Sequence, residues 1–112
     1  MKSLINLILL LSVFISYSQT FTLVEINAKW NQLNKVDLPK VDGVKNIYTY
    51  LEDQKIEVKE RIKAVPVIIL YKDNKPVKQW TANLSFKLNL TKEEVEHAIR
   101  ENKQTYQRTR SN

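Results

Sequence analysis

The chain has 112 residues, the length of one domain, and carries a formal net charge of +6 at pH 7. It contains no cysteine and a single glycine, which excludes thiol redox chemistry, cysteine metal ligands, cysteine nucleophiles and a glycine-rich phosphate loop. The basic charge suits an anionic partner, but no RNP-like motif, zinc finger or basic helix accompanies it, so we expect no nucleic-acid partner.

The N-terminal residues have the pattern of a secretory signal peptide. Lys2 supplies a positive start, residues 4–15 are mostly apolar, and Ser16 and Ser18 place small residues before Gln19. We therefore predict a signal peptide over residues 1–18 and an exported protein, periplasmic or secreted. The apolar run is short for a bilayer span, so we expect no stable membrane anchor after cleavage.

The mature chain begins with two segments that read as strands. Residues 21–28 are rich in β-branched and aromatic side chains, and alternation places Glu25 and Asn27 on one face of that strand. A loop or short helical turn follows over residues 30–34. The second strand is predicted over residues 44–51.

A short surface helix and a buried strand come next. Asp53 is a candidate N-cap for a helix over residues 55–64. Residues 65–70 are all apolar and mostly β-branched, with a proline near the start, as in a central strand buried on both faces. Because a helix joins the second strand to this one, we expect a right-handed crossover and parallel pairing between them.

The C-terminal half adds a hairpin and a helix. Asp73 and Asn74 predict a tight turn into a partner strand over residues 75–80. Alternating apolar residues over 84–90 predict an extended, half-buried connector. Thr91 and Glu94 form a capping box, which predicts the start of a helix. Val95, Ala98 and Ile99 make the buried apolar stripe of this helix, and its end is predicted to fray from Gln104.

This order, β-loop-β-α-β-β-α, predicts an α/β domain over residues 19–103 with a mixed four-stranded sheet and helices packed on it. A polar, basic tail over residues 104–112 completes the chain.

Residues 24–34 resemble the active-site strand of the thioredoxin family, in which an acidic residue and Ala-x-Trp precede Cys-x-x-Cys. Trp30 matches the family's tryptophan, and Glu25 falls at the position of its buried acid. Asn31 and Asn34 occupy the two cysteine positions. The site is therefore similar to a thioredoxin site in which both cysteine positions are asparagine.

Residues 64–77 resemble the cis-proline strand of that family and the hairpin after it, with Pro66 as the cis-proline. Residues 82–87 continue the similarity to small exported bacterial thioredoxin-like proteins. The resemblance implies a compact thioredoxin-like fold. It departs from the family in lacking both cysteines and in a shortened, proline-containing segment over residues 32–42.

Asparagine can neither attack a disulfide nor carry a redox couple, so we predict no disulfide oxidoreductase activity, no catalytic residue, no metal and no cofactor. The resemblance implies a groove beside Pro66 that binds an extended peptide or protein partner, and hence a binding or accessory module. A non-redox enzyme using the same groove, and binding of the basic tail to an anionic surface, are the alternatives.

The polar residues of the site allow more than one interpretation. Asn31 and Asn34 either line a groove or cap a short helix, and capping is the favoured interpretation. Glu25 is either a buried carboxyl with a raised pKa, or it is paired with a lysine or solvated, which is favoured. The single histidine, His97, is interpreted as a solvated surface residue.

Overall fold

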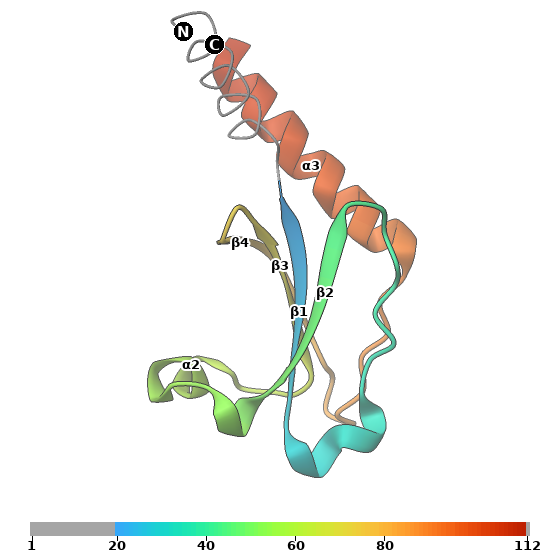
Figure 1. The fold of residues 1–112 in the computed structure, drawn as a ribbon, viewed down its shortest axis with the longest axis vertical. Coiled ribbons are helices and arrows are strands. Elements are labelled where there is room, and N and C mark those ends of the chain that lie inside the picture. Colours follow the sequence, from blue (N-terminus) through green and yellow to red (C-terminus); the bar gives the residue numbers. More distant parts are fainter. Residues whose placement is uncertain (1–19, 112) are drawn as a thin grey trace, which may run out of the picture.

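The computed structural model describes residues 20–111, with side chains described through Lys103. The signal peptide predicted over residues 1–18 lies outside the described residues. In chain order, and with η denoting a 3-10 helix, the elements are β1 (Phe21–Asn27), η1 (Lys29–Asn34), β2 (Val44–Tyr50), η2 (Leu51–Asp53), α2 (Ile56–Arg61), β3 (Val67–Lys72), β4 (Lys75–Thr81) and α3 (Lys92–Ser111) (Figure 1).

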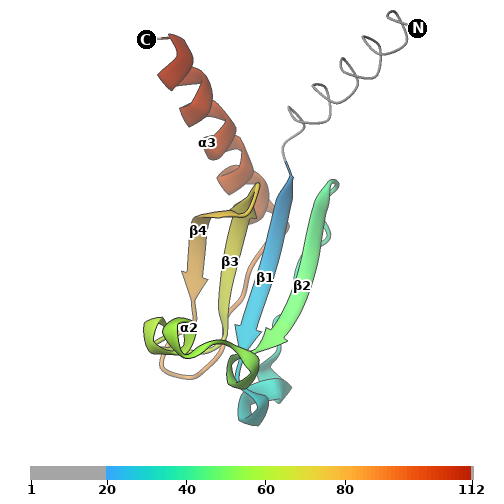
Figure 2. The ribbon, with the colours of Figure 1, turned by 60° about the vertical axis from the view of Figure 1, so that its left-hand side comes forward.

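The strands form one mixed four-stranded sheet in the order β2-β1-β3-β4. The β1 and β2 strands are parallel, whereas β3 is antiparallel to both of its neighbours, β1 and β4 (Figure 2). Helices pack on this sheet, so the predicted fold class is confirmed: the chain is an α/β protein with a thioredoxin-like fold.

The predicted parallel pairing of β2 with the strand after α2 is wrong, because β3 pairs with β1 and runs antiparallel to it. A parallel strand requires the connection to return to the sheet's opposite end. The α2 helix has 6 residues and spans about 9 Å, whereas β2 has 7 residues and spans about 23 Å. After α2 the chain therefore passes the end of β1 and begins β3 at the same end of the sheet at which β2 finishes, so β3 runs antiparallel to β1 and β2.

The hydrophobic core lies between one face of the sheet and α3. Odd-numbered residues of β1 and even-numbered residues of β3 point into it, together with the segment after η1 and the start of α3. Its buried members are Phe21, Leu23, Val36, Leu38, Ile68, Leu70, Leu90, Val95 and Ala98. The α3 helix alone cannot cover the sheet, so the segment after η1 supplies Val36 and Leu38 as a second apolar layer.

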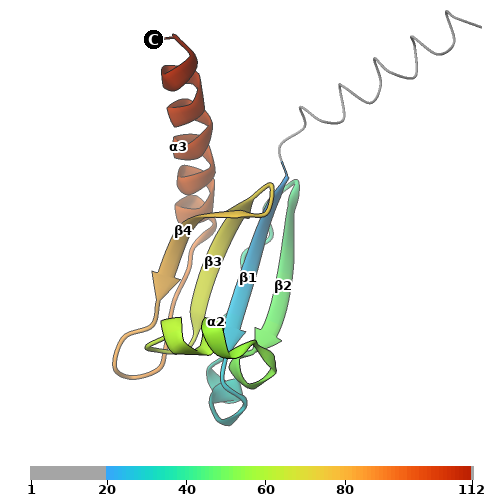
Figure 3. The ribbon, with the colours of Figure 1, turned by 90° about the vertical axis from the view of Figure 1, so that its left-hand side faces the viewer.

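The opposite face of the sheet is less covered. The α2 helix crosses it only at one end, as Figures 1 and 3 show. Val24, Ile69 and Tyr71 on this face are half-buried, and Ile47 of β2 is exposed. Ile26 and Val67, which pair near the end that α2 crosses, are buried, so the apolar side chains that face solvent lie on the part of this face that α2 leaves uncovered.

The predicted hairpin is confirmed. Asp73 and Asn74 have positive φ angles of 50° and 72°, which asparagine and aspartate tolerate better than other non-glycine residues. The Asp73 carboxylate accepts a hydrogen bond from the Thr20 N–H at 2.9 Å, and the Asp73 N–H donates to the Thr20 carbonyl at 2.8 Å. These two bonds fasten the turn to the start of β1.

The capping box is also confirmed. The Glu94 N–H donates to Thr91 Oγ1 at 3.2 Å, and the Thr91 N–H donates to Glu94 Oε2 at 3.4 Å. Val95 and Ala98 are buried, as the stripe predicted. The helix continues through Ser111, past Gln104, where the sequence predicted fraying. Among the described residues, no helix is both long and apolar enough to cross a membrane.

The prediction for the helix between β2 and β3 is wrong at its start. Lys55 precedes the first turn, no side chain caps it, and Asp53 is instead the last residue of η2. The helix ends at Arg61, short of the predicted Ala64. With none of its residues buried, α2 gains little packing that would extend it.

The connector before α3 is not uniformly half-buried, contrary to the prediction. The Asn83 side chain accepts a hydrogen bond from the Ser85 N–H at 2.9 Å, and the Phe86 N–H donates to the Asn83 carbonyl at 3.1 Å. This side-chain-supported turn competes with an extended conformation. Leu84 is consequently fully exposed, whereas Leu88 is half-buried against the core, as predicted, and Leu90 is buried.

Candidate binding site at the carboxyl end of β1

Three asparagines form a hydrogen-bonded cluster where β1 ends and η1 begins. Asn27 Nδ2 donates to the Asn31 carbonyl at 3.0 Å, and Asn31 Nδ2 donates back to Asn27 Oδ1 at 3.0 Å. Asn34 Nδ2 donates to Asn31 Oδ1 at 2.8 Å. We call Asn27, Asn31 and Asn34 the asparagine cluster.

The side chains of Asn31 and Asn34 hydrogen-bond within the asparagine cluster and do not cap η1. The favoured capping interpretation of these two residues is therefore wrong. No side chain caps η1, and Asn31 lies inside it with non-helical angles, φ −106° and ψ 16°. Asn31 is only 4% exposed and also donates to the Phe86 carbonyl at 3.1 Å. Its amide therefore joins β1, η1 and the connector before α3.

Glu25 precedes Asn27 by two residues on the same face of β1, and it is 1% exposed. The Val36 N–H donates to both carboxyl oxygens, at 2.7 and 3.2 Å. Burial raises the pKa of Glu25 above its ordinary value, and the Val36 hydrogen bond and the nearby Lys35 charge oppose that shift in part. Glu25 is thus buried against a backbone N–H, and the favoured lysine-paired or solvated interpretation is wrong.

A cavity of about 270 Å³ opens above Glu25, between β1, β2 and η1. Its lining combines a carboxyl, two amides, three hydroxyls and an ammonium group, from Glu25, Asn27, Gln32, Lys35, Tyr48, Thr49 and Tyr50. Lys35 Nζ lies 3.8 Å from the centroid of the Tyr48 ring, a cation–π contact. The lining offers hydrogen bonds to a small polar molecule but contains no activated nucleophile.

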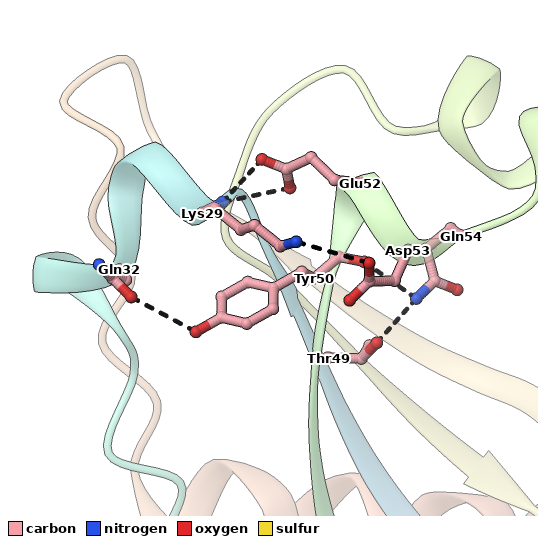
Figure 4. Close-up of polar contacts among 7 residues, drawn as sticks. All are labelled: Lys29, Gln32, Thr49, Tyr50, Glu52, Asp53 and Gln54. Carbon is pink, nitrogen blue, oxygen red and sulfur yellow. Dashed lines mark hydrogen bonds and ion pairs between the residues drawn. The ribbon is translucent and has the colours of Figure 1, made fainter.

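Polar contacts hold η1 against the end of β2 (Figure 4). The Lys29 N–H donates to both carboxylate oxygens of Glu52, at 2.9 and 3.1 Å, and Lys29 Nζ lies 3.7 Å from Asp53 Oδ1. The Tyr50 hydroxyl donates to Gln32 Oε1 at 3.4 Å. Both partners of the Lys29–Asp53 pair are more than half exposed, so these contacts set position more than they add stability.

Four large apolar side chains are exposed to solvent on two segments, η1 and the connector before α3, which the Asn31–Phe86 hydrogen bond joins. Trp30 is 66% exposed, Leu33 97%, Leu84 98% and Phe86 42%. The Trp30 and Phe86 rings pack edge to face, with centroids 5.0 Å apart and an interplanar angle of 88°. We call Trp30, Leu33, Leu84 and Phe86 the end surface.

Pro66 lies next to the connector that carries Phe86. The Val65–Pro66 peptide bond is cis, Pro66 is buried, and its carbonyl accepts a hydrogen bond from the Ala82 N–H at 3.0 Å. Within the described residues, no hydrogen bond joins Pro66 directly to Trp30 or to the asparagine cluster. The connector links them, since it bonds to Pro66 through Ala82 and to Asn31 through Phe86.

The structure thus brings Trp30, Asn31 and Asn34 together and places Glu25 beneath them. Sequence reasoning missed the roles of Asn27 and Phe86. For Asn27 a signal existed: it shares a strand face with Glu25 and precedes Asn31 by four residues, and two polar residues on a buried face need partners.

No group of three or more metal-ligating side chains comes together within the part of the chain that the structure describes. His97 lies on α3, where Nε2 is 3.0 Å from Glu101 Oε1, and both side chains are more than half exposed. The histidine is a surface residue, as interpreted from the sequence.

Comparison with known proteins returned no match, either to a family model or to a curated protein sequence. Membership of the thioredoxin-like family therefore stays a prediction from the residues of this chain, and the order and directions of the four strands are consistent with it.

Proposed function

We propose that this chain is an exported, thioredoxin-like binding module that engages an extended peptide or protein partner through the end surface, without thiol–disulfide exchange. The observation that carries this proposal is the exposure of four large apolar side chains on η1 and on the connector to which Asn31 hydrogen-bonds, with the Trp30 and Phe86 rings in contact. Such clusters are uncommon on soluble monomers and mark interaction sites.

The buried contacts beneath the end surface support the same function. Asn31 hydrogen-bonds to the Phe86 carbonyl, and the Phe86 ring contacts Trp30, so two separate segments of the chain are held in one arrangement. A surface ordered before binding loses less conformational entropy on association. Aromatic residues such as Trp30 are also the side chains that most often dominate binding energy.

The chemistry of the site supports binding without turnover. The chain contains no cysteine, and asparagine amides are not nucleophilic at neutral pH. The asparagine cluster uses its amide groups in hydrogen bonds to one another and to the backbone. These groups contribute rigidity to the surface rather than reactivity.

Selection from a library of random extended peptides, followed by calorimetric titration, tests this proposal. Trp30→Ala and Leu84→Ser should each weaken binding of selected peptides by about tenfold or more, or roughly 1.4 kcal/mol. Ile56→Ser on α2 is the matched control, because Ile56 is 65% exposed and Trp30 66%. Selected peptides that bind Trp30→Ala and wild type equally would overturn the proposal.

The same titration separates this function from the basic-tail alternative. Binding through the end surface should survive deletion of residues 104–112 and change little with salt, because apolar contacts dominate it. Binding that disappears at high salt and upon this deletion would assign the interaction to the tail instead.

A further inference from the structure

We infer that the β2 edge of the sheet is a self-association surface, at which a second copy of this chain pairs antiparallel with β2 about a twofold axis through Ile47. The two sheets would then form one continuous sheet of eight strands, twice the four of each chain. This surface is separate from the end surface, so the inference does not depend on the proposed function.

The β2 strand has a backbone partner on one side only, because it is the outermost strand of the order β2-β1-β3-β4. Within the described residues, no other segment forms a backbone ladder with it, and β2 is the outermost strand of the sheet in the view of Figure 3. Every second residue of an edge strand directs its N–H and C=O outward, so β2 presents a template for another strand.

The two edges of the sheet differ in how they are protected. On β4, Lys75, Pro76 and Lys78 are exposed, and the β3–β4 register shifts between Leu70 and Tyr71. Proline, lysine and register irregularities are the usual devices that prevent edge pairing. The β2 strand has no proline and no shift in its register with β1, and its only charged residue is Lys45.

The sequence of β2 is complementary to itself. A twofold axis at Ile47 opposes Ile47 to its own copy, Lys45 to Thr49, Asn46 to Tyr48 and Val44 to Tyr50, so all 7 residues of the strand are paired. No like charges are opposed within the strand, and aromatic or β-branched pairs of this kind stabilise antiparallel ladders. This match favours a second copy over an unrelated peptide.

The side chains of β2 have the exposure that such pairing requires. Ile47 is 36% exposed and Tyr48 43%. Ile47 pairs with Val24 in the β1–β2 register, so its side chain projects from the sheet face opposite the core. The α2 helix leaves most of that face uncovered, so two copies of Ile47 can meet there without displacing a helix (Figure 3). Pairing would bury both isoleucines against each other.

Single-cysteine cross-linking is a clean test, because the natural chain has no cysteine. Protein expressed from the full 112-residue sequence with Ile47→Cys should form a disulfide-linked dimer on mild oxidation, since opposed Cβ atoms lie about 4.5–5.5 Å apart. The control is Gln79→Cys, at an exposed position on the β4 edge, which should stay monomeric.

Mixing two variants tests the register. Lys45→Cys and Thr49→Cys should cross-link with each other but not with themselves, because only the Ile47-centred pairing opposes these two positions. In sedimentation of the cysteine-free protein, Ile47→Lys should weaken the dimer by about tenfold or more, since it opposes two like charges. Equal cross-linking of Ile47→Cys and Gln79→Cys, or a wild type that sediments only as a monomer, would overturn the inference. So would pairing of β2 with an added peptide but not with itself.

Discussion

Asn27 and Asn31 exchange hydrogen bonds across the junction of β1 and η1. Each side-chain amide donates to the other residue at 3.0 Å, to the carbonyl of Asn31 in one direction and to Oδ1 of Asn27 in the other. Both residues are buried, so the pair satisfies polar groups that would otherwise lie without partners in the interior. At the position where the thioredoxin resemblance implies a reactive cysteine, this chain therefore has an asparagine that holds the local backbone.

Asn31→Ala should destabilise the protein by about 1–3 kcal/mol, because it leaves the Phe86 carbonyl and Asn34 Nδ2 without the partner they have here and removes one of the two donors to Asn27 Oδ1. Urea unfolding monitored by circular dichroism measures this change. The control is Asn34→Ala, which removes one hydrogen bond of a half-buried residue and should cost less. An equal or larger loss in Asn34→Ala would contradict the structural role assigned to Asn31.

The stability of the protein should depend on pH through Glu25. Burial raises the folded-state pKa of Glu25, so between the unfolded value, about 4.3, and the folded value the native state binds more protons than the unfolded state. The contribution of Glu25 is therefore fully present below the unfolded value and is lost as pH rises through the folded one.

Urea unfolding of wild type and Glu25→Gln across that pH range measures this effect. The free energy of unfolding of wild type should fall relative to that of Glu25→Gln as pH rises, because glutamine cannot ionise. Glu60→Gln, on the exposed surface of α2, should behave as wild type. If the wild-type and Glu25→Gln curves stay parallel at all pH values, Glu25 does not have the raised pKa.

How much of this architecture the sequence could predict depends on how local each signal is. The turn at Asp73 and the cap at Thr91 could be predicted, because each depends on residues within three positions along the chain. The position of β3 beside β1 could not, since it depends on the length of α2 relative to β2.

The candidate site was also only partly predictable from the sequence. The apolar alternation over residues 84–90 predicted an extended segment around Phe86, whereas the Asn83 side chain supports a turn that interrupts it. The asparagine cluster could not be predicted as a unit, because the 3-10 geometry of η1 decides which amides meet. Both features depend on side-chain amide hydrogen bonds over two to four residues, which the apolar pattern of the sequence does not register.

Thiols placed at positions 31 and 34 should lie close enough to form a disulfide, because Asn34 Nδ2 and Asn31 Oδ1 are 2.8 Å apart. The double variant Asn31→Cys, Asn34→Cys should lose two hydrogen masses on oxidation, as intact-mass spectrometry would show. Wild type should give no dithiol-dependent reduction of insulin, since it has no thiol. Two free thiols in the oxidised variant would contradict the placement of Asn34 beside Asn31.

Thr91→Ala should destabilise the protein by about 0.5–2 kcal/mol, because it removes the acceptor for the Glu94 N–H at the start of α3. Thermal unfolding measures this loss. Lys92→Ala is the control, since Lys92 is exposed and its contact with Glu96, at 4.0 Å, is weak. A larger effect of Lys92→Ala than of Thr91→Ala would show that the capping box does not fix this end of the helix.

A partner that binds at the end surface should perturb the backbone amides around it, and amide chemical-shift mapping of labelled protein with a selected peptide measures this. We expect the perturbed amides to cluster in residues 29–34 and 83–87, the two segments that carry the exposed apolar side chains. Perturbations confined to β2, α3 or the region after Lys103 would contradict it.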